Sequence, residues 1–374
     1  MNIPISFVLD QAKVTYTVRN NQCDIYCPEC KRKKLNVNFK KGVYRCNKCA
    51  SSGGAISLHQ KLQGFATYDE AKIDLKKRFN GLPVEKRNSV YAQLEKIQNT
   101  IDMKPAPLKI RDQVYRNFLD SQKLSKKHYQ NLKDRGLSDE DIKVGMYKTI
   151  PTMNLDELAK LSLQGIKFNF SSRVGIPGFY DLTKDPKVVT RKNSGFFCPV
   201  MTKDGQISML QIRYDNLPPT ASEKEKENFK KYTCYASTEE KTGCGTSGVE
   251  NIHYSFWLDP DDPPKVIYLT EGELKANVAM ALSKKPFIAL IGVNNTSQLL
   301  EELKYLKKVG VETICLAVDM DYRDKKEVAR AMDKIKGIIK ESGLKLVVCS
   351  WNSEYKGIDD ALFAKQKIYH RIEN

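Results

Sequence analysis

The sequence predicts an α/β protein with several domains, and three observations support this prediction. At 374 residues the chain is long enough for two or three domains. Two Cys-x-x-Cys pairs near the N-terminus predict a small metal-binding domain. From residue 265 onward, short apolar runs alternate with helical segments, which is typical of a parallel α/β domain. The region between these two parts has a mixed helix and strand pattern, so we expect a mixed α+β, basic subdomain there.

The composition favours a polyanionic partner. The net charge of the chain is +17 and its pI is about 9.2. A basic surface without a special role is the alternative. The sequence has no apolar run of about 18 residues and no signal-peptide pattern, so we expect a cytoplasmic protein without membrane contact. In that reducing compartment the ten cysteines are expected to be metal ligands or buried thiols.

The N-terminal region has the spacing of a zinc ribbon. Cys27 and Cys30 form one pair, Cys46 and Cys49 form the other, and fifteen residues separate the pairs. Two such pairs on tight turns supply tetrahedral thiolate coordination, so we expect one structural zinc ion. The alternating residues between the pairs predict a β-hairpin. Buried thiols without metal are the alternative, and Cys23 is a poorer substitute ligand.

Basic residues adjoin this ribbon, beginning at Lys31 and Arg32. Together with Phe39 and Tyr44 on the hairpin they suit single-stranded nucleic acid, because cations follow phosphates and rings stack on bases. A solvated basic face with both aromatic rings in the core explains the same pattern equally well.

Local patterns predict the elements of the first two thirds of the chain. The expected helices are 55–62, 68–79, 114–120 and 126–133. Ser138 with Asp141 has the pattern of a capping box, which marks a helix start. The expected strands are 196–201 and 207–214, followed by a charged loop or short helix at 222–231. The resulting domain prediction is a zinc domain at 1–80, a linker at 81–107, a basic subdomain at 108–260 and a catalytic domain at 261–374.

The last part of the chain predicts a parallel sheet. The expected strands are 266–270, 287–291, 313–318 and 344–349. The expected helices between and around them are 274–282, 297–309 and 325–342. Right-handed crossovers would place the carboxyl ends of all four strands at one edge of the sheet.

Carboxylates follow two of these strands. Glu271-Gly272-Glu273 ends the first strand, and Asp319-Met320-Asp321 follows the third. Ligands bind at the carboxyl edge of such sheets, and clustered carboxylates there suit Mg²⁺ or Mn²⁺. The sequence therefore predicts a divalent metal site that faces a phosphate.

These residues carry a resemblance. The two acidic motifs resemble those of the TOPRIM domain, a Rossmann-like α/β domain of primases, topoisomerases and some nucleases. Residues 46–56 resemble the end of a DnaG-type primase zinc domain. Residues 195–213 with Lys231-Tyr232, and 129–138, resemble the basic half of the primase core. The pieces occur in the family's order, so the chain resembles a DnaG-type primase of bacteria and phages.

The motifs also depart from the family pattern. Cys30 stands where cellular primases often have a histidine, which is closer to phage versions. Met320 replaces a usual glycine, and Arg323 stands at the third acidic position of topoisomerase-like sites. We expect no helicase-interaction domain after the catalytic domain. The resemblance therefore implies a compact primase of a phage, plasmid or other mobile element, with a replicative helicase supplied in trans.

The resemblance implies roles for named residues. Asp319 and Asp321 would ligate Mg²⁺ or Mn²⁺, and Glu271 would ligate metal or take the proton of a 3′-hydroxyl. Asp359 and Asp360 match the family's last acidic motif and would complete the metal site. The reaction implied is synthesis of RNA primers from NTPs on a single-stranded DNA template.

Basic residues have expected roles as well. Arg213 and Lys231 would contact the phosphates of template and primer. Lys275 would approach a nucleotide phosphate or lie exposed on its helix, and Glu273 would ligate metal or only start that helix. The four histidines are scattered and receive no role. The alternatives are a metal-dependent TOPRIM nuclease and a catalytically silent DNA-binding protein of replication or interference.

Overall fold

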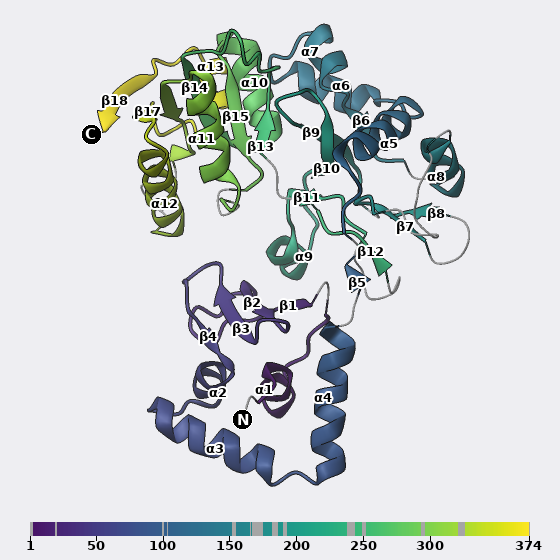
Figure 1. The fold of residues 1–374 in the computed structure, drawn as a ribbon, viewed down its shortest axis with the longest axis vertical. Coiled ribbons are helices and arrows are strands. Elements are labelled where there is room, and N and C mark those ends of the chain that lie inside the picture. Colours follow the sequence, from purple (N-terminus) through teal and green to yellow (C-terminus); the bar gives the residue numbers. More distant parts are fainter. Residues whose placement is uncertain are drawn as a thin grey trace. The chain divides into compact units, whose positions relative to one another are not determined.

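The computed structural model has a mixed α/β fold with several sheets (Figure 1). It describes residues 3–18, 21–98, 101–102, 104–151, 155–164, 166, 175–181, 186–189, 193–237, 244–248, 252–292, 296–320 and 326–373. Residues 1–103 with 218–229 and 238–245 form one compact unit, and the remaining residues form a second. Among the described helices, none has the length and apolar character needed to cross a membrane.

The first unit is built on a small antiparallel sheet. Its strands follow the order β1 (Gln22–Ile25), β2 (Leu35–Asn38), β3 (Val43–Cys46) and β4 (Ser52–Gly54). Strands β2 and β3 form the predicted hairpin, with Leu35 opposite Cys46 and Val37 opposite Tyr44. The inward face of β2 is apolar, since Leu35 and Val37 are fully buried.

Helices cover this small sheet. They are α1 (Ile5–Gln11), α2 (Ala55–Gln63), α3 (Tyr68–Asn80) and α4 (Val84–Gln98). Helix α3 begins at a capping box, in which Thr67 accepts from the backbone of Glu70 and the Glu70 carboxylate accepts from Thr67. Helix α4 occupies most of the segment expected to be a linker, and Val90 and Leu94 pack on the unit's core. The unit also contains the short elements β5 (Ile101–Asp102), α9 (Glu223–Asn228) and β12 (Cys244–Gly245).

The second unit begins with helices around an antiparallel sheet. The helices are α5 (Leu108–Asp120), α6 (Lys126–Lys133), α7 (Asp139–Val144) and α8 (Leu155–Leu163). The sheet has the order β11 (Tyr232–Cys234), β10 (Ile207–Tyr214), β9 (Gly195–Met201) and β6 (Lys148–Thr149). A small ribbon of β7 (Phe179–Asp181) and β8 (Pro186–Val188) lies outside this sheet. The predicted helix 126–133 and the capping box at Ser138 and Asp141 are confirmed.

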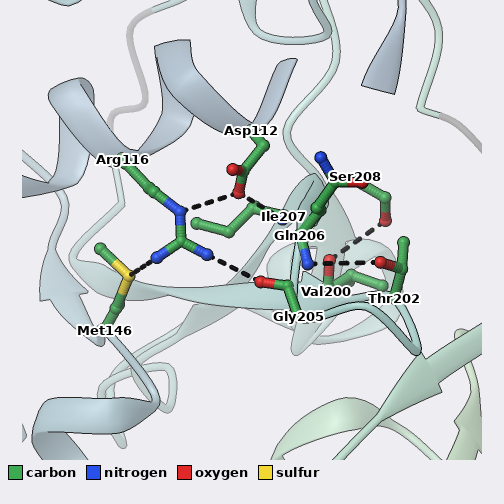
Figure 2. Close-up of polar contacts among 9 residues, drawn as sticks. All are labelled: Asp112, Arg116, Met146, Val200, Thr202, Gly205, Gln206, Ile207 and Ser208. Atoms are coloured by element: carbon green, nitrogen blue, oxygen red, sulfur yellow. Dashed lines mark hydrogen bonds and ion pairs between the residues drawn. The ribbon is translucent and has the colours of Figure 1, made fainter. Parts of the chain in front are cut away.

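Polar contacts hold α5 against the β9–β10 hairpin (Figure 2). The Asp112 carboxylate accepts from the backbone of Ile207 at 2.7 Å and from Arg116 at 2.9 Å. Arg116 also donates to the carbonyl of Gly205 at 2.7 Å. Gly205 has a positive φ of 69°, which the tight turn requires and which glycine adopts without strain. Because one ion pair satisfies two backbone groups of the hairpin, the position of β10 is well defined.

The rest of the second unit is a six-stranded sheet. Its order is β13 (Ile252–Tyr254), β15 (Phe287–Leu290), β14 (Val266–Glu271), β16 (Thr313–Leu316), β17 (Lys345–Ser350) and β18 (Tyr369–Glu373). The four predicted strands are confirmed as parallel neighbours. The antiparallel strands β13 and β18 at the two edges were not predicted.

Helices cover both faces of this sheet (Figure 1). Helices α11 (Leu299–Val309) and α12 (Lys326–Ser342) pack on one face through leucine and isoleucine side chains. Helices α10 (Glu273–Ser283) and α13 (Ile358–Phe363) pack on the other face through small residues such as Ala276 and Ala361. The small side chains let these two helices approach the sheet closely, near the acidic motifs.

Candidate functional site

Four thiols of the first unit form the predicted metal-binding group. Cys27 and Cys49 have their sulfur atoms 3.6 Å apart, and those of Cys30 and Cys46 are 3.7 Å apart. All four sulfur atoms lie within 4.8 Å of one another. A tetrahedral zinc ion with Zn–S bonds of ~2.3 Å needs sulfur atoms roughly 3.8 Å apart. The group therefore fits one structural zinc ion, and Cys23 lies outside it, buried on β1.

The two cysteine pairs occupy equivalent turns. The backbone N–H of Lys31 donates to the carbonyl of Cys27 at 2.9 Å, and that of Ala50 donates to Cys46 at 3.0 Å. Lys31 and Ala50 both have positive φ, of 56° and 60°. This repeated geometry points both pairs of thiols toward one centre.

The aromatic residues of the hairpin belong to the core. Phe39 and Tyr44 are 1% and 2% exposed, and the Tyr44 hydroxyl lies 3.0 Å from that of Ser57. The stacking role expected of Tyr44 is therefore wrong, because its ring has no free face for a base. Alternation along a strand does not show which face is buried until the neighbouring helices are known. Lys31 and Arg32 are exposed, as nucleic-acid contacts require.

In the second unit the predicted acidic residues lie at a topological switch point. Strand β14 has β15 on one side and β16 on the other, so the chain leaves β14 in one direction and later returns on the opposite side. Such a reversal opens a crevice at the carboxyl ends of the two central strands. Glu271 ends β14, and Asp319 follows β16, whose Leu316 is the partner of Leu269. Both carboxylates therefore lie at the mouth of this crevice.

Asp319 is buried among cations. It is 6% exposed, and its carboxylate accepts from Lys275 on α10. Lys356 lies 3.2 Å from its other oxygen. Two ammonium groups on one buried carboxylate show that this position attracts positive charge. Asp321 and Arg323 lie outside the described residues.

Asp359 and Asp360 begin α13 beside the same crevice. Asp359 is 5% exposed and pairs with Arg135 at 3.3 Å. Burial raises the pKa of Asp359, while Lys275 and Arg135 act in the opposite direction. Its Oδ1 has no hydrogen-bond partner within the described part of the chain. Asp360 is exposed and accepts from the backbone of Gly357 at 3.4 Å, so it caps the helix.

Asp319 and Asp359 are both buried and both interact with Lys275, and the unpartnered Oδ1 of Asp359 is an oxygen that a divalent cation would take as a ligand. Mg²⁺ and Mn²⁺ take oxygen ligands of this kind. Glu271 is only half-buried at the end of β14, where it remains accessible. The residues present thus fit the expected metal, with Asp319 and Asp359 as the buried donors.

Glu273 lies below this edge rather than in it. Its side chain is fully buried, and burial raises its pKa to about 7. The thiol of Cys198 hydrogen-bonds to it. With the Gln211 amide turned so that its nitrogen faces Glu273, that nitrogen donates at 2.8 Å. Glu273 therefore connects α10 to β9 and β10, which is a structural position and not a ligand position.

Basic residues surround the acidic edge. Arg213 is 6% exposed on β10 and lies over the ring of Phe196. Lys231 precedes β11, and its pKa is lowered by burial first and then by Arg213, Arg135 and Lys356. Each of these three cations is therefore close enough to repel Lys231. Such a group gains stability from a bound polyanion, which would relieve the repulsion.

The structure adds residues that sequence analysis missed. Arg135 and Lys356 had no predicted role, although both pair with predicted carboxylates. Arg135 lies 224 positions from Asp359 in the chain, so no local pattern connects them. Lys356 precedes the Gly-Ile-Asp-Asp motif directly, and this adjacency was the one available signal.

A family model and several solved structures match this chain. A family described as a domain of unknown function (DUF3854) matches residues 256–369. No curated protein matches the sequence. Among solved structures, the zinc-binding and RNA polymerase domains of the Aquifex aeolicus primase are 15% identical, with a TM-score of 0.46. That alignment covers 98% of this chain and 84% of that one.

Two further structures are similar to the chain. The DnaG catalytic core is 15% identical with a TM-score of 0.47, over 70% of this chain and 76% of that one. The primase fragment of the bacteriophage T7 primase-helicase protein is 12% identical with a TM-score of 0.37. Its alignment covers 94% of this chain and 96% of that one.

Proposed function

We propose that the protein is a DNA primase that synthesises short RNA primers on single-stranded DNA. The observation that carries this proposal is the crevice at the switch point of the parallel sheet. Glu271 and Asp319 follow two neighbouring strands there. After β17, Asp359 pairs with Arg135 of the basic subdomain, and Lys231 is close enough to Asp360 to be affected by its charge. An acidic edge for metal beside a basic surface for phosphate suits phosphoryl chemistry on nucleic acid.

The reaction would join a 3′-hydroxyl to the α-phosphorus of an incoming NTP. The new oxygen–phosphorus bond forms as the bond to the β-phosphate breaks, and pyrophosphate leaves. Asp319, Asp321 and Asp359 would hold Mg²⁺ or Mn²⁺, which neutralises charge on the triphosphate when bound. Glu271 would take the hydroxyl proton or add a ligand.

The cations would bind the substrates. Arg213 and Lys231 are placed to pair with template or primer phosphates, since both adjoin the carboxylate edge and repel each other when no anion is present. Lys275 would release Asp319 and contact a nucleotide phosphate once a metal ion is bound. The zinc ribbon and its exposed Lys31 and Arg32 would contribute to binding of the single-stranded template, with a replicative helicase supplied in trans.

Two other functions fit part of this arrangement. A metal-dependent nuclease would use the same carboxylates to activate water against a phosphodiester. A catalytically silent DNA-binding protein would use only the basic surfaces. The zinc ribbon and the order of the motifs in the chain favour synthesis over both.

Primer synthesis on single-stranded DNA with labelled NTPs and Mg²⁺ or Mn²⁺ separates these functions. The wild type is compared with Asp319→Asn and with Asp333→Asn, which changes an exposed carboxylate on α12. We expect short RNA products from the wild type and Asp333→Asn, and at least a hundredfold less from Asp319→Asn. Metal-dependent cutting of the template without synthesis would favour the nuclease. DNA binding alone would favour the silent protein or a primase that requires its helicase.

A further inference from the structure

Two cysteines and a histidine meet on one face of the six-stranded sheet, and none of the three has a part in the proposed reaction. Cys315 lies on β16, Cys349 on β17 and His370 on β18. Their ligand atoms all lie within 4.8 Å of one another. Within the described part of the chain, this is one of two groups of at least three such side chains that are close enough to share a metal ion, and the zinc ribbon is the other.

The strand register explains why these side chains meet. His370 is the direct partner of Cys349, and Cys315 is the direct partner of Val347, two residues before Cys349. Directly paired residues and residues two apart on one strand share a sheet face. Three neighbouring strands therefore each present one ligand to the same face, where the thiols are 4% and 1% exposed.

A disulfide bond does not suit the two thiols. Diagonal residues on neighbouring strands have Cα atoms roughly 7–8 Å apart. A disulfide bond needs a Cα separation below ~7 Å, so the strands would have to shift to form one. The two thiols instead lie near each other as two separate metal ligands, and the imidazole offers a third ligand atom from another direction.

We propose that Cys315, Cys349 and His370 bind a second zinc ion, or another soft divalent cation, independently of the ribbon. Two thiolates and one imidazole are a donor set that zinc favours. Tetrahedral bonds of ~2.0–2.3 Å need ligand atoms roughly 3.5–3.8 Å apart, which small side-chain rotations reach from the present positions. His370 is exposed, so water fills the fourth position from the solvent side.

Neighbouring residues support this geometry. Nε2 of His370 lies 3.0 Å from the Tyr268 hydroxyl, and a metal ion would displace that hydroxyl to take this nitrogen as its ligand. The other ring nitrogen hydrogen-bonds to the backbone of Ile368. Such second contacts orient a histidine that ligates metal. Lys285 donates to the same hydroxyl at 2.9 Å. Its positive charge does not oppose the site, because two thiolates neutralise a divalent cation.

The consequence of binding is a cross-link between β16, β17 and β18. Strand β18 is an edge strand, and its first four residues are exposed. It is held to the sheet mainly by backbone pairing with β17. A metal ion would anchor it through His370, so metal loading should slow amide hydrogen exchange in β18.

The test uses the full chain and the metal alone. The protein is stripped with a chelator under reducing conditions, loaded with Zn²⁺, desalted and analysed for bound zinc. The variants are His370→Gln, which changes an exposed side chain and leaves the fold intact, and Cys315→Ser. Cys234→Ser is the matched control, because that thiol lies on β11 outside both groups.

We expect two equivalents of zinc in the wild type and in Cys234→Ser. In His370→Gln and Cys315→Ser the second equivalent should bind at least about tenfold more weakly. Zinc should slow exchange in β18 of the wild type but not of His370→Gln. A single equivalent in the wild type, or two equally tight equivalents in His370→Gln, would overturn the proposal. The measurement needs no enzymatic activity, so it is independent of the proposed primase function.

Discussion

The buried carboxyl group of Glu273 makes the stability of the second unit depend on pH. Its folded-state pKa of about 7 exceeds its usual value of 4.5, because burial disfavours the charged form. The folded protein therefore holds this proton more tightly than the unfolded chain does. The contribution to stability is complete below pH ~4.5 and is lost as the pH rises through ~7. Glu273→Gln keeps the shape and removes the titration.

The size of the effect follows from the two pKa values. One pKa unit corresponds to 1.36 kcal/mol. Compared with a side chain that stays neutral, Glu273 therefore lowers the free energy of unfolding by about 3 kcal/mol at pH ~8 and by about 1 kcal/mol at pH ~5. The Gln211 amide donates to the carboxylate in its turned orientation and so stabilises the charged form. We therefore expect Glu273→Gln to be more stable than the wild type at pH ~8. This gain in the free energy of unfolding should be ~2 kcal/mol larger at pH ~8 than at pH ~5.

Urea unfolding followed by tryptophan fluorescence measures this difference for the second unit, which contains Glu273. The chain has two tryptophans, Trp257 and Trp351, and both belong to the second unit. Glu301→Gln is the control, since Glu301 is exposed on α11. Its pH profile should follow that of the wild type. Parallel profiles for Glu273→Gln and the wild type would refute the argument, since they would mean that Glu273 does not retain its proton in the fold.

Three further outcomes are expected. Cys30→Ser should lose the ribbon zinc and the protection of β2 and β3 from amide hydrogen exchange. The reason is that structural zinc supplies ~10–16 kcal/mol, as much as the stability of a whole domain. Retained zinc and protection would contradict the assignment. Lys231→Gln should weaken binding of single-stranded DNA equally for all sequences and lower the salt slope by about 0.7; an unchanged slope in salt titrations would exclude a phosphate contact. Lys275→Met should tighten Mn²⁺ binding without nucleotide about fivefold, since its ammonium group pairs with Asp319; titrations showing equal or weaker binding would exclude this competition.

Elements with a strong local signal could be predicted from the sequence. The helix 126–133 begins after Ser125, whose hydroxyl accepts from the backbone of His128, and such caps are visible in sequence. The parallel strands are continuous apolar runs, as strands covered on both faces must be. Strand β18 has no such run, because most of it is exposed at an edge, and it could not be recognised in the same way.

The site could be predicted only in part, for a physical reason. Glu271 and Asp319 follow apolar strands, and parallel strands bring their carboxyl ends together. Arg135 reaches Asp359 only through the packing of two distant segments, which local patterns do not encode. Tyr44 shows the converse limit, since an aromatic residue on a short hairpin suits a core and a binding face equally well.

The proposed function depends most on the binding of a divalent cation at the carboxylate edge through Asp319. Electron paramagnetic resonance of Mn²⁺ measures this directly, because free and bound Mn²⁺ differ in signal. Wild type and Asp333→Asn should bind Mn²⁺ with the same Kd, and Asp319→Asn should bind at least about tenfold more weakly, a loss of ~1.4 kcal/mol or more. An equal Kd for all three proteins would contradict the claim and remove Asp319 from the metal site.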